Sequence, residues 1–208
     1  MLLPRPWRFF CAALLFANLF VALPGQAEQA AQGLGMPGMP GRDGREGGGE
    51  LTPIEALDVP RYMGRWFEIA KFPNTFQKKC VGDTRADYRL LPEGGVQVIN
   101  RCRMADGQWN EAVGLARQVG GRQSPKLEVR FAPVWLSFIP AVWGDYWVID
   151  LDADYQLVAV SEPRRAYLWV LSRTPQVSPA AYEGLLARLR ARGFDLGKLE
   201  TTVQGTTD

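Results

Sequence analysis

The amino-acid sequence predicts an all-β fold, an eight-stranded up-and-down antiparallel β-barrel (a calyx) with one C-terminal α-helix packed on its outside. Three observations predict it. From Leu51 onward, short apolar or alternating runs follow one another, separated by turn residues. Helical periodicity enters only near the C-terminus. Consecutive antiparallel strands joined by short loops hide their edges by closing into a barrel, and a barrel of this size holds one small ligand. Strand spacing alone leaves a β-sandwich as the alternative.

The strands are expected wherever a run of alternating or apolar residues lies between turn signals. They span 64–72, 84–91, 96–103, 109–119, 126–131, 144–151, 156–161 and 167–173. The sequence PEGG at 92–95 is typical of a hairpin loop, and the glycine pair at 120–121 of a tight turn. The strands therefore follow one another as consecutive neighbours, which is the order of an up-and-down barrel.

The single helix begins after the last strand. Ser178 is expected as its N-cap, with Pro179 at the first helical position and Gly193 as the C-terminal stop. One face is apolar at the spacing i, i+3, i+4, i+7, through Tyr182, Leu185, Leu186 and Leu189. This stripe needs a surface to cover, and the outside of the barrel is the one available.

The composition fits one globular domain, since the 208 residues are 47% hydrophobic and 22% charged. The net charge of +2 gives no support to a nucleic-acid partner.

Residues 1–27 are expected to be a signal peptide, because Arg5 and Arg8 precede an apolar run that ends in a small-residue cleavage site at Ala27. An uncleaved membrane anchor is the alternative. Residues 28–50 are a Gly/Pro-rich flexible tether, and 51–208 form the folded domain.

Cleavage would leave two cysteines, Cys80 and Cys102, in an oxidising compartment. We expect a disulfide between them, although strict hairpin register puts Cys80 past Cys102, so that the chain before the second strand must curl back. Two buried free thiols and a cysteine catalyst are the alternatives. The catalyst is disfavoured because the chain has no histidine to activate a thiolate.

Three short motifs carry a resemblance to the lipocalin family. Gly64 and Trp66 resemble the glycine-x-tryptophan signature of the first strand, whose tryptophan closes the narrow end of the barrel. The sequence GDY around Asp145 resembles the second signature, and Arg173 resembles the arginine that packs over the tryptophan. The resemblance covers about residues 57–203.

Within that family the phrases GRWFEIAKFP, VINRCR and YLWVLSRTP are similar to the bacterial lipocalins of outer-membrane lipoprotein type, to apolipoprotein D and to the temperature-induced lipocalins of plants. The resemblance implies secretion across the inner membrane into the periplasm, with outer-membrane association as a further expectation. Cys11 lies too early in the apolar run to serve as a lipoprotein cysteine, so no lipobox and no lipid anchor are expected.

Loops after the first, third, fifth and seventh strands should share the open mouth, at 73–82, 104–108, 132–143 and 162–165. The third contributes apolar candidates for ligand binding, Trp135, Phe138 and Trp143, and its neighbours contribute the basic candidates Lys78 and Arg164. The candidates for the calyx interior are Tyr146, Val148, Tyr167, Trp169 and Leu171. A folded-in lid, a solvated rim and ordinary core packing are the alternatives. Glu68, if it faces inward, needs hydrogen-bond donors.

No catalytic residue, metal site or cofactor is expected. The absence of histidine excludes a Ser-His-Asp triad and the common histidine-ligated zinc sites. Asp150, Asp152 and Asp154 imitate the start of a calcium loop, but Tyr155 stands where its glycine belongs and Ser161 where its glutamate belongs, so a turn explains them better.

The expected function is therefore non-enzymatic binding of a lipophilic ligand, namely a fatty acid, a lysophospholipid or a phospholipid, in the bacterial envelope. Peripheral membrane contact is expected at the mouth, and the chain is expected to be a monomer or a dimer. One alternative is a protein-interaction module that docks through the apolar loop 133–143, and another is a lipocalin-type enzyme.

Overall fold

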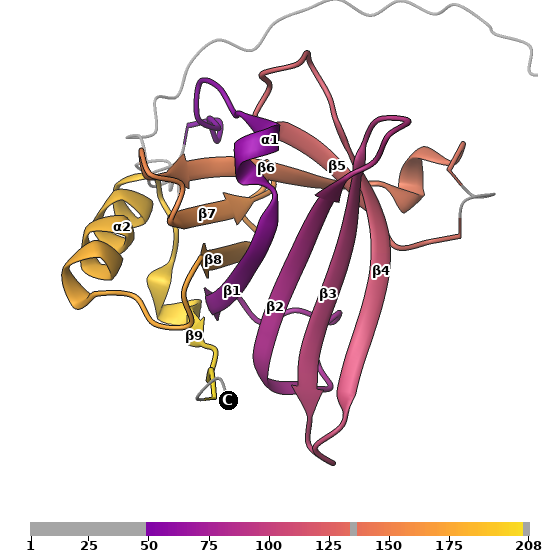
Figure 1. Ribbon diagram of the computed structural model, residues 1–208. Coiled ribbons are helices and arrows are strands. Elements are labelled where there is room, and N and C mark those ends of the chain that lie inside the picture. The colour runs from indigo at the N-terminus through magenta and orange to yellow at the C-terminus, as the bar shows by residue number, and fades with distance from the viewer. Residues whose placement is uncertain (1–48, 134–136, 206–208) are drawn as a thin grey trace, which may run out of the picture. The chain divides into compact units, whose positions relative to one another are not determined.

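The computed structural model describes residues 49–133 and 137–205 (Figure 1). The predicted signal peptide, nearly all of the predicted tether and Trp135 lie outside these ranges, so the expectations for them stay predictions. The elements in chain order are α1 (Val59–Tyr62), β1 (Gly64–Lys71), β2 (Cys80–Leu90), β3 (Val96–Met104), β4 (Trp109–Gln118), β5 (Lys126–Arg130), η2 (Pro140–Val142), β6 (Gly144–Leu151), β7 (Leu157–Ser161), β8 (Leu168–Ser172), α2 (Pro179–Ala191), η3 (Leu196–Lys198) and β9 (Glu200–Thr201).

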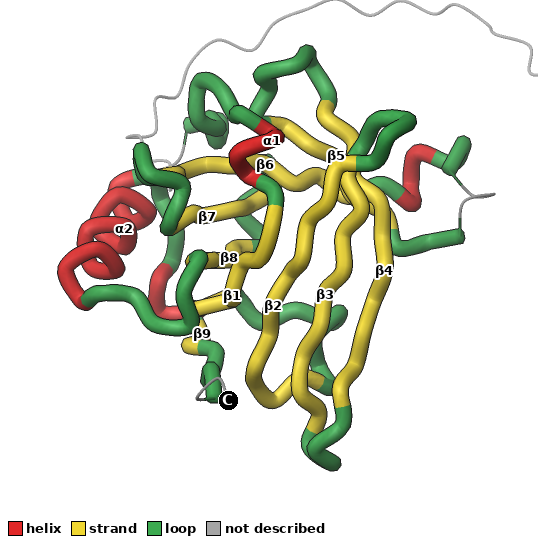
Figure 2. The backbone as a smooth tube through the Cα atoms, in the orientation of Figure 1, coloured by secondary structure: helices red, strands yellow, loops and turns green. Residues whose placement is uncertain are grey.

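The strands form one antiparallel sheet that closes on itself. Each strand from β1 to β8 pairs with its neighbour in sequence, and β1 pairs with both β2 and β8. This closure confirms the predicted up-and-down barrel and excludes the sandwich. Figure 2 shows the strands, in yellow, lying side by side, with the helical segments, in red, at their periphery.

The C-terminal segment completes the wall between β1 and β2. The pairing between β1 and β2 ends at Phe67, and a bulge follows in β1. Beyond that point β9 lies beside β1, and the Thr202 amide donates to the Ile69 carbonyl at 2.9 Å. On the other side, the Asp83 amide of β2 donates to the Val203 carbonyl at 2.8 Å. A strand of two residues gives no periodicity, so β9 was not predicted from the sequence.

Two hydrophobic clusters share the wall of the barrel. The outer cluster lies under α2, as predicted, and the helix buries Leu185 and Leu189 completely. Its N-cap is Ser178, whose hydroxyl accepts from the Ala181 amide. The inner cluster fills the closed end around Trp66. Among the described residues, no helix has the length and apolar character needed to cross a bilayer.

The second strand begins earlier than predicted, at Cys80 instead of Thr84. Its first part pairs with β3 irregularly, with shifts between Cys80 and Gly82 and again between Gly82 and Arg85. These bulges interrupt the period-two alternation on which the sequence prediction depended. The short helix α1 was also missed, because four residues are too few for a helical pattern.

Candidate functional site

The closed end of the barrel is organised by Trp66 and Arg173. The Trp66 side chain is fully buried, and its indole Nε1 donates to the Tyr62 carbonyl at 2.9 Å. The Arg173 guanidinium lies 3.9 Å from the centre of the Trp66 ring and donates to the carbonyls of Arg65, Tyr62 and Tyr155. Partial burial lowers the pKa of Arg173 from its usual value, but the group remains a cation. This arrangement ties α1, β1 and the β6–β7 turn together.

Of the predicted signature residues, Gly64 meets the cluster formed by Trp66 and Arg173, whereas Asp145 does not. Gly64 meets this cluster, with a φ of 96° and an added Cβ that would stand 3.2 Å from Arg173 Nη1. Asp145 does not meet it, because it lies at the start of β6 in register with Glu128. Tyr155, in the β6–β7 turn, approaches Arg173 instead. The tripeptide GDY therefore stands at the start of β6, as predicted, but Asp145 does not join the closed-end cluster.

The predicted interior set does face the calyx. Tyr146, Val148, Trp169 and Leu171 all pack in or against the cluster around Trp66, on the inner side of the wall. Val148 is fully buried, whereas Tyr146 and Trp169 retain accessible surface. The alternation of side chains along a strand cannot by itself show which face points into the barrel. The structure confirms that these four side chains point inward.

Tyr167 lies at the mouth end of this set. Its ring stacks on Trp169 with centroids 5.7 Å apart and meets Phe76 of the first mouth loop at 5.5 Å. Phe76 is 71% exposed. Aromatic rings therefore extend from the interior at Trp169 to the surface of the first mouth loop.

Three tyrosine hydroxyls meet at the deep end of the calyx, and we call Tyr62, Tyr88 and Tyr146 the tyrosine cluster. The Tyr146 hydroxyl lies 2.7 Å from that of Tyr62 and 3.1 Å from that of Tyr88. Burial raises the pKa of Tyr88 to about 12 and raises those of Tyr62 and Tyr146 well above the usual value. All three are neutral at physiological pH. Sequence reasoning found Tyr146 but missed Tyr62 and Tyr88, because they come from two other elements.

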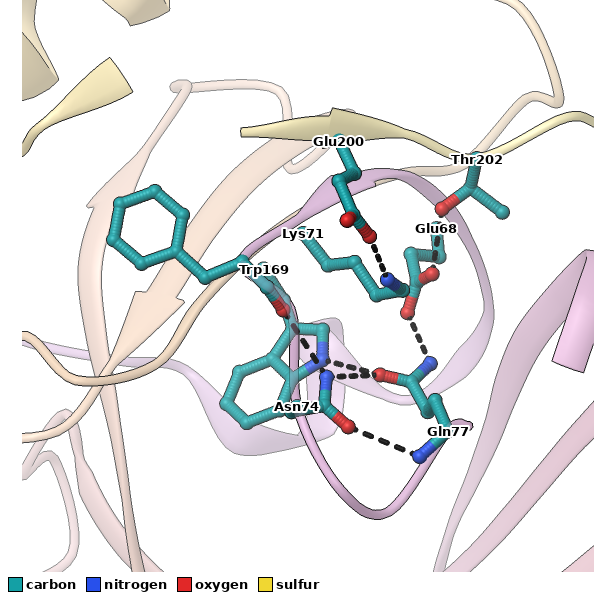
Figure 3. A network of polar contacts seen from close by, with 8 residues as sticks. Glu68, Lys71, Asn74, Gln77, Trp169, Glu200 and Thr202 are labelled. Atoms are coloured by element: carbon teal, nitrogen blue, oxygen red, sulfur yellow. Dashed lines mark hydrogen bonds and ion pairs between the residues drawn. The ribbon is translucent and has the colours of Figure 1, made fainter. Parts of the chain in front are cut away.

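A buried carboxylate lies near the mouth, in the network of Figure 3. Glu68 is 2% exposed, and its oxygens accept from Gln77 Nε2 and Thr202 Oγ1, both at 2.6 Å. Gln77 Oε1 in turn accepts from Trp169 Nε1 at 3.1 Å and from Asn74 Nδ2 at 2.7 Å. Burial raises the pKa of Glu68 despite these donors. The network joins the first mouth loop, the calyx wall and the C-terminal segment, and it supplies the donors that Glu68 was expected to need.

The basic candidates at the mouth are exposed. Lys78 lies on the first mouth loop, and the Arg164 side chain is 84% exposed, with Nε 3.6 Å from a Glu162 oxygen. Arg165 turns away from this rim, since it donates to the carbonyls of Arg192 and Gly49.

The described part of the apolar loop divides between two directions. Phe138 is 78% exposed to solvent. Trp143 packs against the guanidinium groups of Arg117 and Arg130, which lie 4.1 and 5.2 Å from its ring centre. Arg117 has the outward parity of β4, because its neighbour Ala116 belongs to the inner cluster. Trp143 therefore covers the outside of the wall and not the calyx.

Phe131 lines the mouth side of the calyx and was not found from the sequence. An added Cβ at Gly114 would stand 2.7 Å from Phe131 Cδ1. Gly114 shares the inward parity of Ala116, so the Phe131 ring lies inside the wall, where it is 45% exposed. The absence of a side chain at Gly114 makes room for this ring, and such a pairing across two strands leaves no signal along the chain.

The predicted disulfide is present. Cys80 and Cys102 are bonded, with their Cα atoms 5.5 Å apart. Cys80 pairs with Met104, so it does stand past Cys102, and the bulges in β2 provide the predicted curl. The bond fastens the end of the first mouth loop to the calyx wall.

The aspartates after β6 form a turn. Asp152 Oδ1 accepts from the amides of Gln156 and Leu157, both at 2.6 Å, and Oδ2 accepts from the Asp154 amide at 3.2 Å. These bonds use the carboxylate in the turn, as expected from the mismatch to a calcium loop. Within the described ranges, no three His, Cys, Asp or Glu side chains are grouped to hold a metal ion.

Comparisons with known proteins agree with this architecture. A family model described as a lipocalin-like domain matches residues 57–204. The chain is 42% identical over 160 residues to temperature-induced lipocalin-1 of Arabidopsis thaliana, and the aligned region spans 76% of this chain and 85% of that protein. It is 37% identical over 149 residues to outer membrane lipoprotein Blc of Escherichia coli K12, with shares of 71% and 80%, and 33% identical over 157 residues to apolipoprotein D of Mus musculus, with shares of 72% and 78%.

Among solved structures, insecticyanin from the tobacco hornworm Manduca sexta matches with a TM-score of 0.57 at 15% identity, over 76% of this chain and 87% of that one. At this identity the match bears on the fold alone. The three relatives belong to the groups that the phrases GRWFEIAKFP, VINRCR and YLWVLSRTP were predicted to resemble, namely plant temperature-induced lipocalins, bacterial outer-membrane lipoproteins and apolipoprotein D.

Proposed function

Because this chain belongs to the lipocalin family, we propose that it binds a lipophilic ligand in its calyx and carries or stores it in the bacterial cell envelope. The ligand classes that we favour are fatty acids, lysophospholipids and phospholipids. The relationship to the outer membrane lipoprotein of Escherichia coli supports the envelope as the location.

The observation that carries the proposal is the uneven packing inside the barrel. Val148, Val158 and Leu171 are tightly buried on its inner face, whereas Tyr88 and Trp169, which also point inward, keep accessible surface. Accessible surface on inward side chains indicates space that the protein does not fill. Each methylene of a ligand buried there would contribute about 0.8 kcal/mol. Binding would then follow from burial of an apolar chain, with no covalent step.

The mouth has the chemistry to receive an amphiphile that enters tail first. Phe76 and Phe138 expose apolar rings, and Lys78 and Arg164 expose cations on loops of the same end. Cations near a charged lipid surface contribute about 1 kcal/mol each. We therefore place an anionic headgroup at Lys78 and Arg164, and a peripheral membrane contact at the exposed rings.

The first test is to secrete the chain into a bacterial periplasm, purify it, extract it with organic solvent and analyse the extract by mass spectrometry. We expect a stoichiometric acyl lipid. In parallel, displacement of the fluorescent fatty acid cis-parinaric acid measures affinity for added lipids. An empty extract together with no binding of the probe would overturn the carrier proposal.

A pair of adjacent variants locates the binding site. Ala112 has the inward parity of Gly114 on β4, and Val113 points outward and is 52% exposed. Ala112→Trp would fill the calyx, and we expect it to weaken probe binding at least tenfold. Val113→Trp adds the same ring to the outer face and should leave binding unchanged. Equal effects of the two variants would place binding outside the calyx.

A protein-interaction module is the second candidate, favoured by the exposure of Phe138. In that case Phe138→Ser would abolish binding of the partner protein, and Ala112→Trp would leave it intact. The lipid carrier predicts the opposite order for lipid binding, so the same variants distinguish the two functions.

A further inference from the structure

We propose that the tyrosine cluster is a hydrogen-bonding subsite at the deep end of the calyx, and that it selects lipids with a neutral oxygen, a hydroxyl or a carbonyl, at the end that enters first. The inference rests on the proposed function and deepens it, since it specifies the far end of the ligand and not its headgroup.

The first argument is the balance of hydrogen-bonding groups. Three phenol hydroxyls carry three hydrogens, and two bonds join them, Tyr62 to Tyr146 and Tyr146 to Tyr88. Whatever the direction of the two bonds, one hydrogen remains without an acceptor among the described residues. A buried donor without an acceptor is costly, so it favours a partner that can reach it. A ligand oxygen in the calyx is such a partner.

The second argument is the direction in which the cluster is open. Tyr62 is 2% exposed and sealed against Trp66, with ring centroids 5.0 Å apart. Tyr88 and Tyr146 retain accessible surface, and both side chains point into the barrel. The remaining hydrogen-bonding capacity of the cluster therefore faces the calyx and not the outside of the protein.

The third argument is charge. The raised pKa values keep all three phenols neutral, and the nearby Arg173 directs its donors to backbone carbonyls, including that of Tyr62. A ligand carboxylate at this depth would lose its hydration and meet only neutral donors, which is unfavourable. A neutral hydroxyl or carbonyl loses much less and can satisfy the cluster. The subsite thus favours a lipid that is oxygenated at its far end.

The test compares fatty acids in matched pairs that differ by one terminal hydroxyl, such as hexadecanoic and 16-hydroxyhexadecanoic acid, at chain lengths from 12 to 18 carbons. Displacement of cis-parinaric acid gives the affinity of each. At the length that reaches the cluster, we expect the ω-hydroxy acid to bind about three- to tenfold tighter, the effect of one hydrogen bond. Without such a bond, the extra hydroxyl weakens binding because it loses its water.

Phenylalanine variants assign any preference to the cluster. Either calyx-facing hydroxyl alone can still offer one hydrogen to the ligand, so the test combines Tyr88→Phe with Tyr146→Phe. This double variant removes both hydroxyls that face the calyx, and it should abolish the preference while the plain fatty acid still binds. Tyr182→Phe, on helix α2 outside the calyx, is the matched control and should keep it. Circular dichroism establishes that each variant is folded. If the double variant does not fold, the wild-type series decides the matter, because a subsite at a fixed depth gives a preference only at the chain length that reaches it.

The outcomes separate this inference from the proposed function. If the wild-type chain binds the plain acid more tightly at every length, or if the folded double variant retains the preference, the subsite is overturned and the lipid carrier stands. If no acid of either series displaces the probe, both proposals fail.

Discussion

The arginine at the closed end offers the sharpest test of how this barrel is held together. Arg173→Met keeps an unbranched apolar stem but removes four hydrogen bonds, to the carbonyls of Arg61, Tyr62, Arg65 and Tyr155. Each such bond contributes about 0.5–1.5 kcal/mol net. The guanidinium over the indole of the first strand adds about 0.5–2 kcal/mol. Because the arginine is only partly buried, we expect a loss of about 3–5 kcal/mol in the free energy of unfolding, below the full total.

The assay is urea denaturation followed by tryptophan fluorescence and circular dichroism, with Arg117→Met as the control. Arg117 also lies over a tryptophan ring, Trp143 at 4.1 Å, but its side chain is 53% exposed and its ion pair with Glu128 is on the surface. Such contacts are worth about 1 kcal/mol or less. If Arg173→Met costs no more than Arg117→Met, the closed end does not depend on this arginine and the reasoning is refuted.

Two further predictions concern the mouth. Burial holds the folded-state pKa of Glu68 above the usual value for a glutamate, so the stability it contributes is present below that usual value and is lost as the pH rises through the folded pKa. Glu68→Gln can still accept from Gln77 and can donate to Thr202, so its stability relative to wild type should rise over that pH window; parallel urea midpoints across the window would contradict this. Replacing Cys80 and Cys102 by serine should cost about 2–4 kcal/mol. Reduced wild-type protein should match the double variant, and a variant as stable as the oxidised chain would show that the bond does not stabilise the fold.

The parts of the fold that the sequence predicts are those encoded by neighbouring residues. The turns at 92–95 and 120–121 and the cap at Ser178 are local signals, and each was confirmed. The barrel then follows, because short loops leave consecutive strands few other ways to pair. The bulges in β2 and the two-residue β9 have no such signal, since each depends on a partner strand distant in sequence.

The site was only partly predictable for the same reason. Side chains alternate between the two faces of each strand, so the sequence leaves two possible inward sets. The packing around Trp66 decides which set faces the calyx. The direction of Trp143 depends on two arginines from β4 and β5. The tyrosine cluster joins α1, β2 and β6, so no motif along the chain describes it.

The glycine two places before Trp66 links the closed end to the ligand. Its positive φ turns the chain into β1, and the absence of a Cβ leaves room for Arg173 Nη1. Trp66 and Arg173 then both donate to the backbone carbonyl of Tyr62. The same residues that seal the barrel therefore set the position of a hydroxyl in the deep subsite. It follows that Arg173→Met should reduce the preference for ω-hydroxy acids as well as the stability, whereas Arg117→Met should change neither by much.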